Sequence, residues 1–189
     1  MMNKLLLAPV LIGAACIMAG IYGALHDQIS YTVSTGYFHE FKFIQFNIAP
    51  SLQNRLGAAI VGWLASWWMG IVIGVPICLS ALTVRGIRAF IRAFLLAALT
   101  VIGVTLLIGL TGLAIGFLII QDGNLPSWMV GRDVTDPVSF ARAGMMHDFS
   151  YLGGMVGLLA GAAVVIRQAV TSRRTAPRPV SHRSNGFHE

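Results

Sequence analysis

Charged residues are scarce in this sequence. Asp, Glu, Lys and Arg make up 11% of its 189 residues, whereas 56% are hydrophobic. A soluble domain of this size usually carries about 25% charged residues, because its surface must face water. The composition therefore excludes a soluble enzyme, a disordered chain and, with only 2 cysteines, a disulfide-stabilised secreted module. We expect one integral membrane domain covering residues 1–166.

Motifs that carry known chemistry are missing as well. Cys16 and Cys78 lie alone in apolar runs, where cysteine behaves as a small hydrophobic residue. The sequence contains no CxxC pair, phosphate-binding loop, Ser-His-Asp arrangement or nucleic-acid motif. We therefore attribute the net charge of +6 to membrane orientation, with no nucleic-acid partner. These absences favour a protein that is not an enzyme.

Long apolar windows are what the sequence has in abundance. Crossing the hydrocarbon core of a bilayer takes roughly 20 helical residues. Four uncharged windows predict spans at residues 5–25, 56–84, 93–121 and 149–166. The outer loops are then residues 26–55 and 122–148, and the inner loop is residues 85–92. The predicted fold class is an all-α integral membrane protein, a four-transmembrane-helix bundle with an aromatic extracytoplasmic cap and a disordered basic C-terminal tail.

Local signals refine the ends of these spans. The first window is longer than the apolar core of a signal peptide, roughly 7–15 residues, which favours a retained span over a cleaved leader. Pro76 predicts a kink in the second window. Asp136 followed by Pro137 is a favourable helix start, so we expect a helix over residues 138–147 ahead of the fourth span. The tail, residues 167–189, is rich in Arg, Ser and Pro and is predicted to be disordered beside anionic lipid head groups.

The distribution of positive charge orients the spans. Lys and Arg are retained in the cytoplasmic loops of membrane proteins. With the N-terminus inside, nine of the 13 cations lie on the cytoplasmic side, and six of the 7 acidic residues lie outside. Both termini are therefore predicted to be cytoplasmic in a multi-pass protein.

Small residues recur at four-residue spacing in every predicted span. Lipid is as apolar as leucine, so membrane helices associate where small residues let their backbones approach closely. The spacing predicts a tight bundle, whose helix partners lie in the same chain or in a homo-oligomer. In the second, third and fourth spans the pattern is carried by Gly70, Gly74, Gly112, Gly116, Gly153, Gly157 and Gly161.

Three His-acid dipeptides lie in or beside the outer loops, on one side of the membrane in this topology. Imidazole is the commonest metal ligand in proteins, and a nearby carboxylate can ligate the metal or orient the ring. A site of this kind suits zinc, copper, non-haem iron or haem. Its candidate ligands are His26, His39 and His147, with Asp27, Glu40 and Asp148 as further ligands or supporting groups.

Interfacial polar caps are the alternative interpretation of these dipeptides. Neighbouring residues of a helix point about 100° apart, so the His and Asp of one pair are not expected to face one ion without a break in the helix. A metal motif of known spacing, such as HExxH, is absent.

The first outer loop is unusually aromatic. Residues 29–33 alternate like a strand, and residues 37–48 fit either a returning strand or a helix lying on the membrane. Exposed aromatic clusters commonly serve as docking surfaces. The leading interpretation is a scaffold or accessory subunit whose loop binds a membrane-protein partner. The alternative is a metal- or haem-binding membrane protein, with redox chemistry as an option. The aromatic residues of the loop are Tyr31, Tyr37, Phe38, Phe41, Phe43 and Phe46.

Four short runs lie in or beside the first outer loop: residues 26–33 (HDQISYTV), 37–38 (YF), 41–43 (FKF) and 52–55 (LQNR). Together they resemble a family of small four-span bacterial inner-membrane proteins. The resemblance covers roughly the first 85 residues of the chain. It implies a location in the bacterial inner membrane and carries over no activity, cofactor or catalytic residue.

The predicted topology is testable with reporter fusions. A reporter fused after Arg88 is expected to be active on the cytoplasmic side, because the inner loop retains three arginines. A reporter placed at Gly131 is expected to be active outside. Reversed signals would place the histidines on the cytoplasmic face and contradict the prediction.

Overall fold

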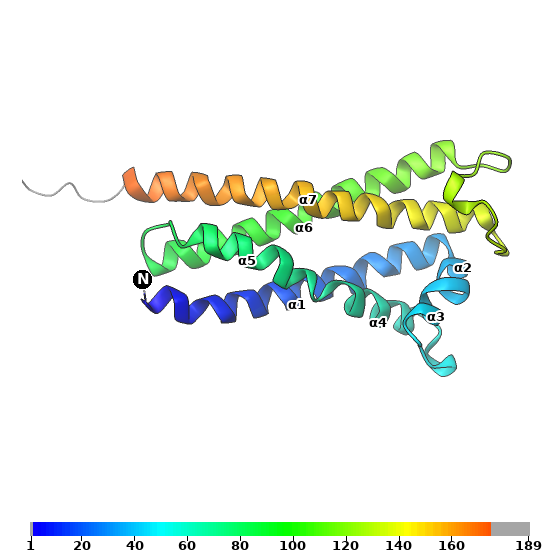
Figure 1. Ribbon diagram of the computed structural model, residues 1–189, viewed down its shortest axis with the longest axis horizontal. Coiled ribbons are helices and arrows are strands. Elements are labelled where there is room, and N and C mark those ends of the chain that lie inside the picture. Colours follow the sequence, from blue (N-terminus) through cyan, green and yellow to red (C-terminus); the bar gives the residue numbers. More distant parts are fainter. Residues whose placement is uncertain (1, 175–189) are drawn as a thin grey trace, which may run out of the picture.

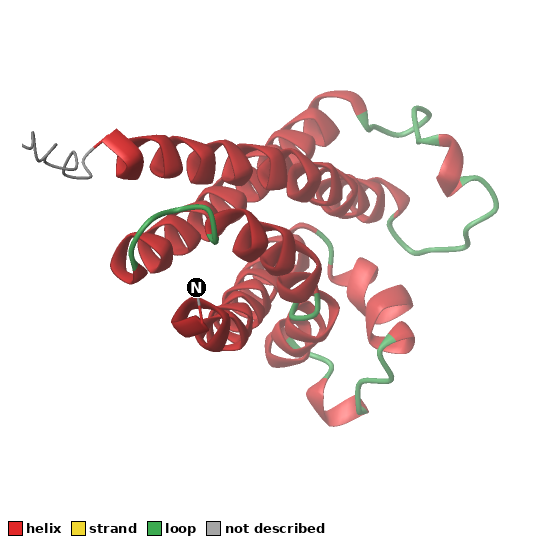
Figure 2. Ribbon diagram, turned by 60° about the vertical axis from the view of Figure 1, so that its left-hand side comes forward, coloured by secondary structure: helices red, strands yellow, loops and turns green. Residues whose placement is uncertain are grey.

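Long helices lie side by side along the molecule, with a small helical cap at one end (Figure 1). The computed structural model describes residues 2–174. Its long elements are α1 (Met2–Val33), α4 (Arg55–Ser66), α5 (Met69–Ala81), α6 (Ile87–Ile119) and α7 (Pro137–Arg174). α1 packs against α4 and α5, while α6 packs along α7. The fold is all-helical over the described residues, and Figure 2 shows helices joined by loops.

The cap begins where α1 ends, beyond the predicted first span. α1 runs to Val33, so residues 29–33 are helical and the strand predicted there is wrong. A five-residue alternation is too short to outweigh the continuation of a helix that is already formed. The Ser34 hydroxyl then accepts a hydrogen bond of 3.1 Å from the backbone N–H of Tyr37 and starts α2 (Thr35–Tyr37).

The rest of the cap is built from short helical turns. A π-helical turn η1 (Phe38–Lys42) and α3 (Phe43–Gln45) follow α2, and a 3-10 turn η2 (Pro50–Leu52) leads toward α4. Of the two alternatives for residues 37–48, the structure therefore has the helical one. The cap lies across the end of the bundle, where α2 and α3 are drawn in Figure 1.

Aromatic side chains of the first outer loop form a hydrophobic core inside the cap. Tyr37, Phe38 and Phe43 are buried, and the ring of Tyr37 lies 4.9 Å from that of Phe140 in α7. Burial follows from the position of the cap, because its inner face covers apolar helix ends. The aromatic loop is therefore divided between these buried rings and three half-buried ones, Tyr31, Phe41 and Phe46.

The second predicted span, residues 56–84, is broken in the middle. α4 and α5 meet at a bend of 42°. The break lies at Trp67 and Trp68, which the sequence did not predict, whereas Pro76, where a kink was predicted, lies inside the continuous α5. Gly62 and Gly70, on either side of the break, each face the backbone of α1. The bend between α4 and α5 thus lets both helices pack on α1, and it does not lie at Pro76.

α6 and α7 are longer than the spans predicted for them. α6 begins at Ile87, directly after Gly86, whose φ of 84° lies in the region that favours glycine. Asp136 caps α7 as predicted: its Oδ1 accepts a hydrogen bond of 3.0 Å from the backbone N–H of Ser139, which holds the pKa of Asp136 below its usual value. Because α7 continues to Arg174, residues 167–174 are helical and the predicted disorder is wrong there. Residues 175–189 of the predicted tail lie outside the described residues.

Close backbone contacts at glycines join the helices within one chain. A Cβ atom at Gly157 would lie 2.9 Å from the carbonyl oxygen of Val101, and one at Gly153 would lie 2.9 Å from Cα of Thr105. α7 can approach α6 this closely only because these side chains are absent. Of the other glycines predicted to pack, Gly70 and Gly74 face α1, Gly112 and Gly116 face α7, and Gly161 faces α5 and α6.

Within residues 2–174, three helices are long and apolar enough to cross a membrane. They are Lys4–Val33, Ile87–Ile119 and Pro137–Arg173, and the bent pair of α4 and α5 would make a fourth if it is one span. Both described ends of the chain lie at one end of the bundle, and the cap and the loop before α7 lie at the other (Figure 1). The candidate site described next lies near the capped end.

Replacing Gly157 with leucine tests this packing. Gly157→Leu is expected to lower the free energy of unfolding by about 1–3 kcal/mol, the usual range for overpacking, because the side chain would collide with α6 at Val101. The matched control is Gly103→Leu, where a Cβ meets nothing within 4 Å. Thermal unfolding in detergent measures both. Equal stability of the two variants would contradict close packing at Gly157.

Candidate metal centre

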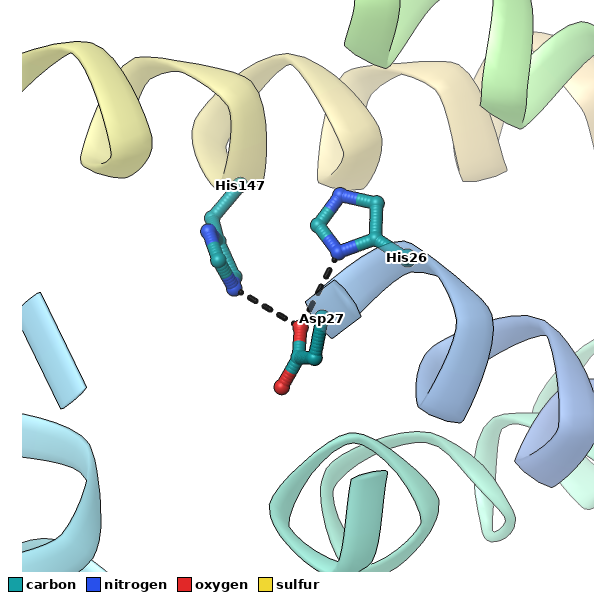
Figure 3. A group of neighbouring side chains, drawn as sticks. All are labelled: His26, Asp27 and His147. Carbon is teal, nitrogen blue, oxygen red and sulfur yellow. Dashed lines mark hydrogen bonds and ion pairs between the residues drawn. The ribbon is translucent and has the colours of Figure 1, made fainter. Parts of the chain in front are cut away.

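Two histidines and an aspartate converge where α1 and α7 meet below the cap. His26 and Asp27 come from α1 and His147 from α7, and all three side chains point toward one another (Figure 3). Asp27 Oδ1 lies 3.0 Å from His26 Nδ1 and 3.2 Å from His147 Nε2. The three potential ligand atoms lie within 4.8 Å of one another. The side chains of His26 and Asp27 are 5% exposed and that of His147 is 11% exposed, so water has little access.

His26 and Asp27 meet although they are neighbours in α1. We expected the angle of about 100° between neighbouring residues to keep such a pair from facing one ion, and this expectation is wrong. The imidazole and the carboxylate are long enough to turn toward each other from adjacent Cα atoms, as the distance of 3.0 Å shows. α1 is unbroken at this point.

The outward nitrogens of both histidines have hydrogen-bond partners of their own. His147 Nδ1 donates to the carbonyl oxygen of Ala143, one turn earlier in α7, at 2.9 Å. His26 Nε2 lies 3.0 Å from the hydroxyl oxygen of Ser150, which also donates to the carbonyl oxygen of Met146 at 2.9 Å. These contacts orient the rings so that the inward nitrogens point at Asp27.

The same contacts decide which atoms carry hydrogen. A carbonyl oxygen can only accept, so the hydrogen of a neutral His147 must be on Nδ1. Its Nε2 then presents a lone pair to the carboxylate of Asp27 at 3.2 Å. When Ser150 donates its one hydrogen to Met146, the Ser150 oxygen can only accept from His26. The hydrogen of a neutral His26 is then on Nε2, and its Nδ1 also presents a lone pair to Asp27. Acceptors that face each other in a buried site repel, so a metal ion held among these atoms would stabilise this arrangement.

An apolar cavity of about 140 Å³ extends from this site between the helices. Lys42, the last residue of η1, lines the same cavity and is 8% exposed. Its Nζ donates to Gln45 Oε1 at 3.2 Å and lies 4.8 Å from the ring centre of Phe41. Burial lowers the pKa of Lys42, and the negative charges of Asp27 and Asp148 oppose this shift. One buried lysine and one buried aspartate therefore line the same cavity.

The other predicted site residues lie elsewhere. His39 is exposed, with its Nε2 3.4 Å from the hydroxyl of Tyr31, and it is not among the converging ligand atoms. Glu40 Oε2 accepts a hydrogen bond of 3.0 Å from the backbone N–H of Thr135 and so ties the cap to the loop before α7. Asp148 is exposed on α7. The predicted grouping of three histidines is therefore wrong: the turn that carries Lys42 inward leaves His39 outside.

Ser150, Lys42 and the cavity were missed by sequence reasoning. Ser150 follows His147 by three residues, which places both on one face of a helix, so this spacing could have identified it. Lys42 could have been identified because it is the one lysine in a loop that contains six aromatic residues. The cavity has no signal in the sequence, because it is the space between helices that are far apart in the chain and meet only in the folded structure.

Comparisons with known proteins add no assignment. No protein-family model, curated protein or solved structure matches the chain. The resemblance to bacterial inner-membrane proteins therefore stays a prediction, and the class of protein is defined by its own geometry: an all-helical bundle with a buried His-Asp-His cluster.

Removing the carboxylate is expected to destabilise the bundle. In protein treated with a chelator, Asp27→Ala should lower the free energy of unfolding by roughly 1–3 kcal/mol, the cost of leaving buried polar groups without their hydrogen-bond partner. Asp148→Ala, which removes an exposed carboxylate from the next helix, is the control and should change stability little. Chemical unfolding in detergent compares the two, and similar losses would contradict a bridging role for Asp27.

Proposed function

We propose that this chain is a four-span integral membrane protein that binds a transition-metal ion between His26, Asp27 and His147. The observation that carries the proposal is the convergence of two imidazole nitrogens and one carboxylate oxygen in a buried site. Two histidines with one carboxylate form the ligand set of open zinc sites and of non-haem iron sites. Such a site keeps at least one coordination position for a water molecule or another ligand.

The distances between the ligand atoms support metal binding. Ligand atoms about 2.0–2.2 Å from a metal lie about 3.0 Å apart at right angles and about 3.3–3.6 Å apart in a tetrahedron. The carboxylate oxygen lies 3.0 Å and 3.2 Å from the two nitrogens. The two imidazole nitrogens lie within 4.8 Å of each other, so the rings would move closer together to surround an ion.

The hydrogen bonds behind the ligands support it as well. Metal-bound histidines usually donate their second ring N–H to a carbonyl, carboxylate or hydroxyl group. His147 does so to Ala143, and His26 has Ser150 in the corresponding place. A metal ion would also remove the repulsion between the lone pairs of the inward nitrogens and the carboxylate.

Apolar helices and chain direction support the membrane part of the proposal. Three helices and one bent pair have the length and hydropathy of spans. Both described chain ends lie at the same end of the bundle, as four spans require. With the charge distribution of the sequence, the site would lie near the outer face of the bacterial inner membrane, and both termini would be cytoplasmic.

The alternatives receive less support. The rings of His26 and His147 touch edge to face with centroids 4.7 Å apart, which leaves no gap for a porphyrin plane between them. For partner docking, three of the six aromatic residues of the loop are buried in the cap and cannot contact a partner while the cap is folded. We therefore place metal binding ahead of haem binding and of a scaffold role.

Elemental analysis of the purified protein tests the metal proposal. Protein from cells supplied with zinc, iron, copper and manganese is expected to contain about one metal ion per chain. His26→Ala and His147→Ala should each lose it, because each variant removes one of three ligands. His39→Ala is the matched control and should retain the metal, since His39 is outside the cluster. Absence of metal from the unaltered protein, or equal metal content in all four proteins, would overturn the proposal.

A further inference from the structure

We infer that the cavity behind the metal site holds the hydrocarbon chain of a fatty acid, with its carboxylate between the metal ion and Lys42. This inference rests on the proposed metal site and names the ligand for its open position. Three properties of the cavity carry it: the segregation of polar and apolar lining, the length of the lining, and the charge at the polar end.

Polar and apolar residues line opposite parts of the cavity. His26, Asp27 and His147 meet below the cap (Figure 3), Ser150 contacts His26, and Lys42 lines the same cavity. Away from them the lining is apolar and comes from α1, α5 and α6; it includes Ala15, Ile73, Ile77, Phe94, Ala98 and Val101. A ligand that satisfies both parts has one polar head and a hydrocarbon tail.

The lining of the cavity extends along the helices. Along α1 its lining extends from Ala15 to Asp27, which at a rise of about 1.5 Å per residue corresponds to about 18 Å. Its volume of about 140 Å³ is spread over that length. A lining of this length accommodates one extended alkyl chain.

Charge at the polar end favours an anionic head group. Asp27 supplies one negative charge and Lys42 one positive charge, and both are buried. A divalent ion would add two positive charges without a negative partner. Buried charge is costly unless it is paired, so an anion is the complementary ligand. A carboxylate can occupy the open metal position with one oxygen and accept a hydrogen bond from Lys42 with the other.

Gly154 marks the wall of the cavity on α7. A Cβ atom there would meet nothing within 4 Å, although Gly153 and Gly157 on the same helix lie against α6. Gly154 lines the cavity, as does Ala98 on α6. A large side chain at either position would fill the space assigned to the hydrocarbon chain and leave the metal ligands in place.

The test is a fluorescence titration of the full-length, zinc-loaded protein in detergent with cis-parinaric acid, a fluorescent fatty acid. Gly154→Phe is expected to weaken binding at least tenfold, and Ala98→Phe should do the same if Gly154→Phe fails to fold. Gly103→Phe, where the added side chain points into open space, should bind as the unaltered protein does.

Competition identifies the head group. Palmitate should displace the probe at least tenfold better than methyl palmitate, which lacks the charge, and Lys42→Gln should abolish this preference. Unchanged binding to both cavity-filling variants would overturn the inference. So would equal competition by the ester, or stronger competition by a phospholipid or a short-chain quinone.

Zinc content of the same samples separates the two proposals. Retained zinc without binding of the acid would overturn the fatty-acid site and leave metal binding intact. The opposite outcome is a protein that holds no zinc but still binds the acid, with binding that depends on Gly154 and Lys42. That outcome would overturn the metal proposal and leave the assignment of the cavity to a fatty acid intact.

Discussion

A single buried carboxylate oxygen, Asp27 Oδ1, contacts the imidazole nitrogens of both His26 and His147 and so joins α1 to α7. The closest packing lies within two parts, α1 with α4 and α5, and α6 with α7, and an apolar core with residues from α1, α5, α6 and α7 also joins them. A carboxylate is expensive to bury unless it is paired, so Asp27 keeps its position only while both parts approach it.

Glycine packing sets how the rest of the site is arranged. A Cβ atom at Gly109 would collide with the hydroxyl of Ser150, so the absence of a side chain on α6 leaves room for the residue that contacts His26. Close packing of α7 on α6 and of α5 on α1 leaves the space between the two parts less completely filled, and the cavity lies there. The close glycine contacts within each pair of helices therefore leave the cavity between the pairs.

The cap closes the polar end of that cavity. Its buried rings cover the helix ends, and η1 turns Lys42 inward toward the site. π-helical turns occur frequently at functional sites, because the wider turn changes the direction of the following side chains. The aromatic loop thus contributes to the site by shielding it from water.

Composition and local pattern determined the helical class, the positions of the long apolar segments, the start of α7 at Asp136 and the glycines that face other helices. These features depend on hydropathy, capping and side-chain size, which are properties of short stretches of chain. The break at Trp67 and Trp68, the burial of the aromatic rings, the exclusion of His39 and the meeting of His26 with Asp27 and His147 were decided only by the tertiary structure. Each depends on which helices lie side by side and at what depth. His26 and His147 are 121 residues apart in the chain, and no local pattern specifies that their helices bring them to the same carboxylate.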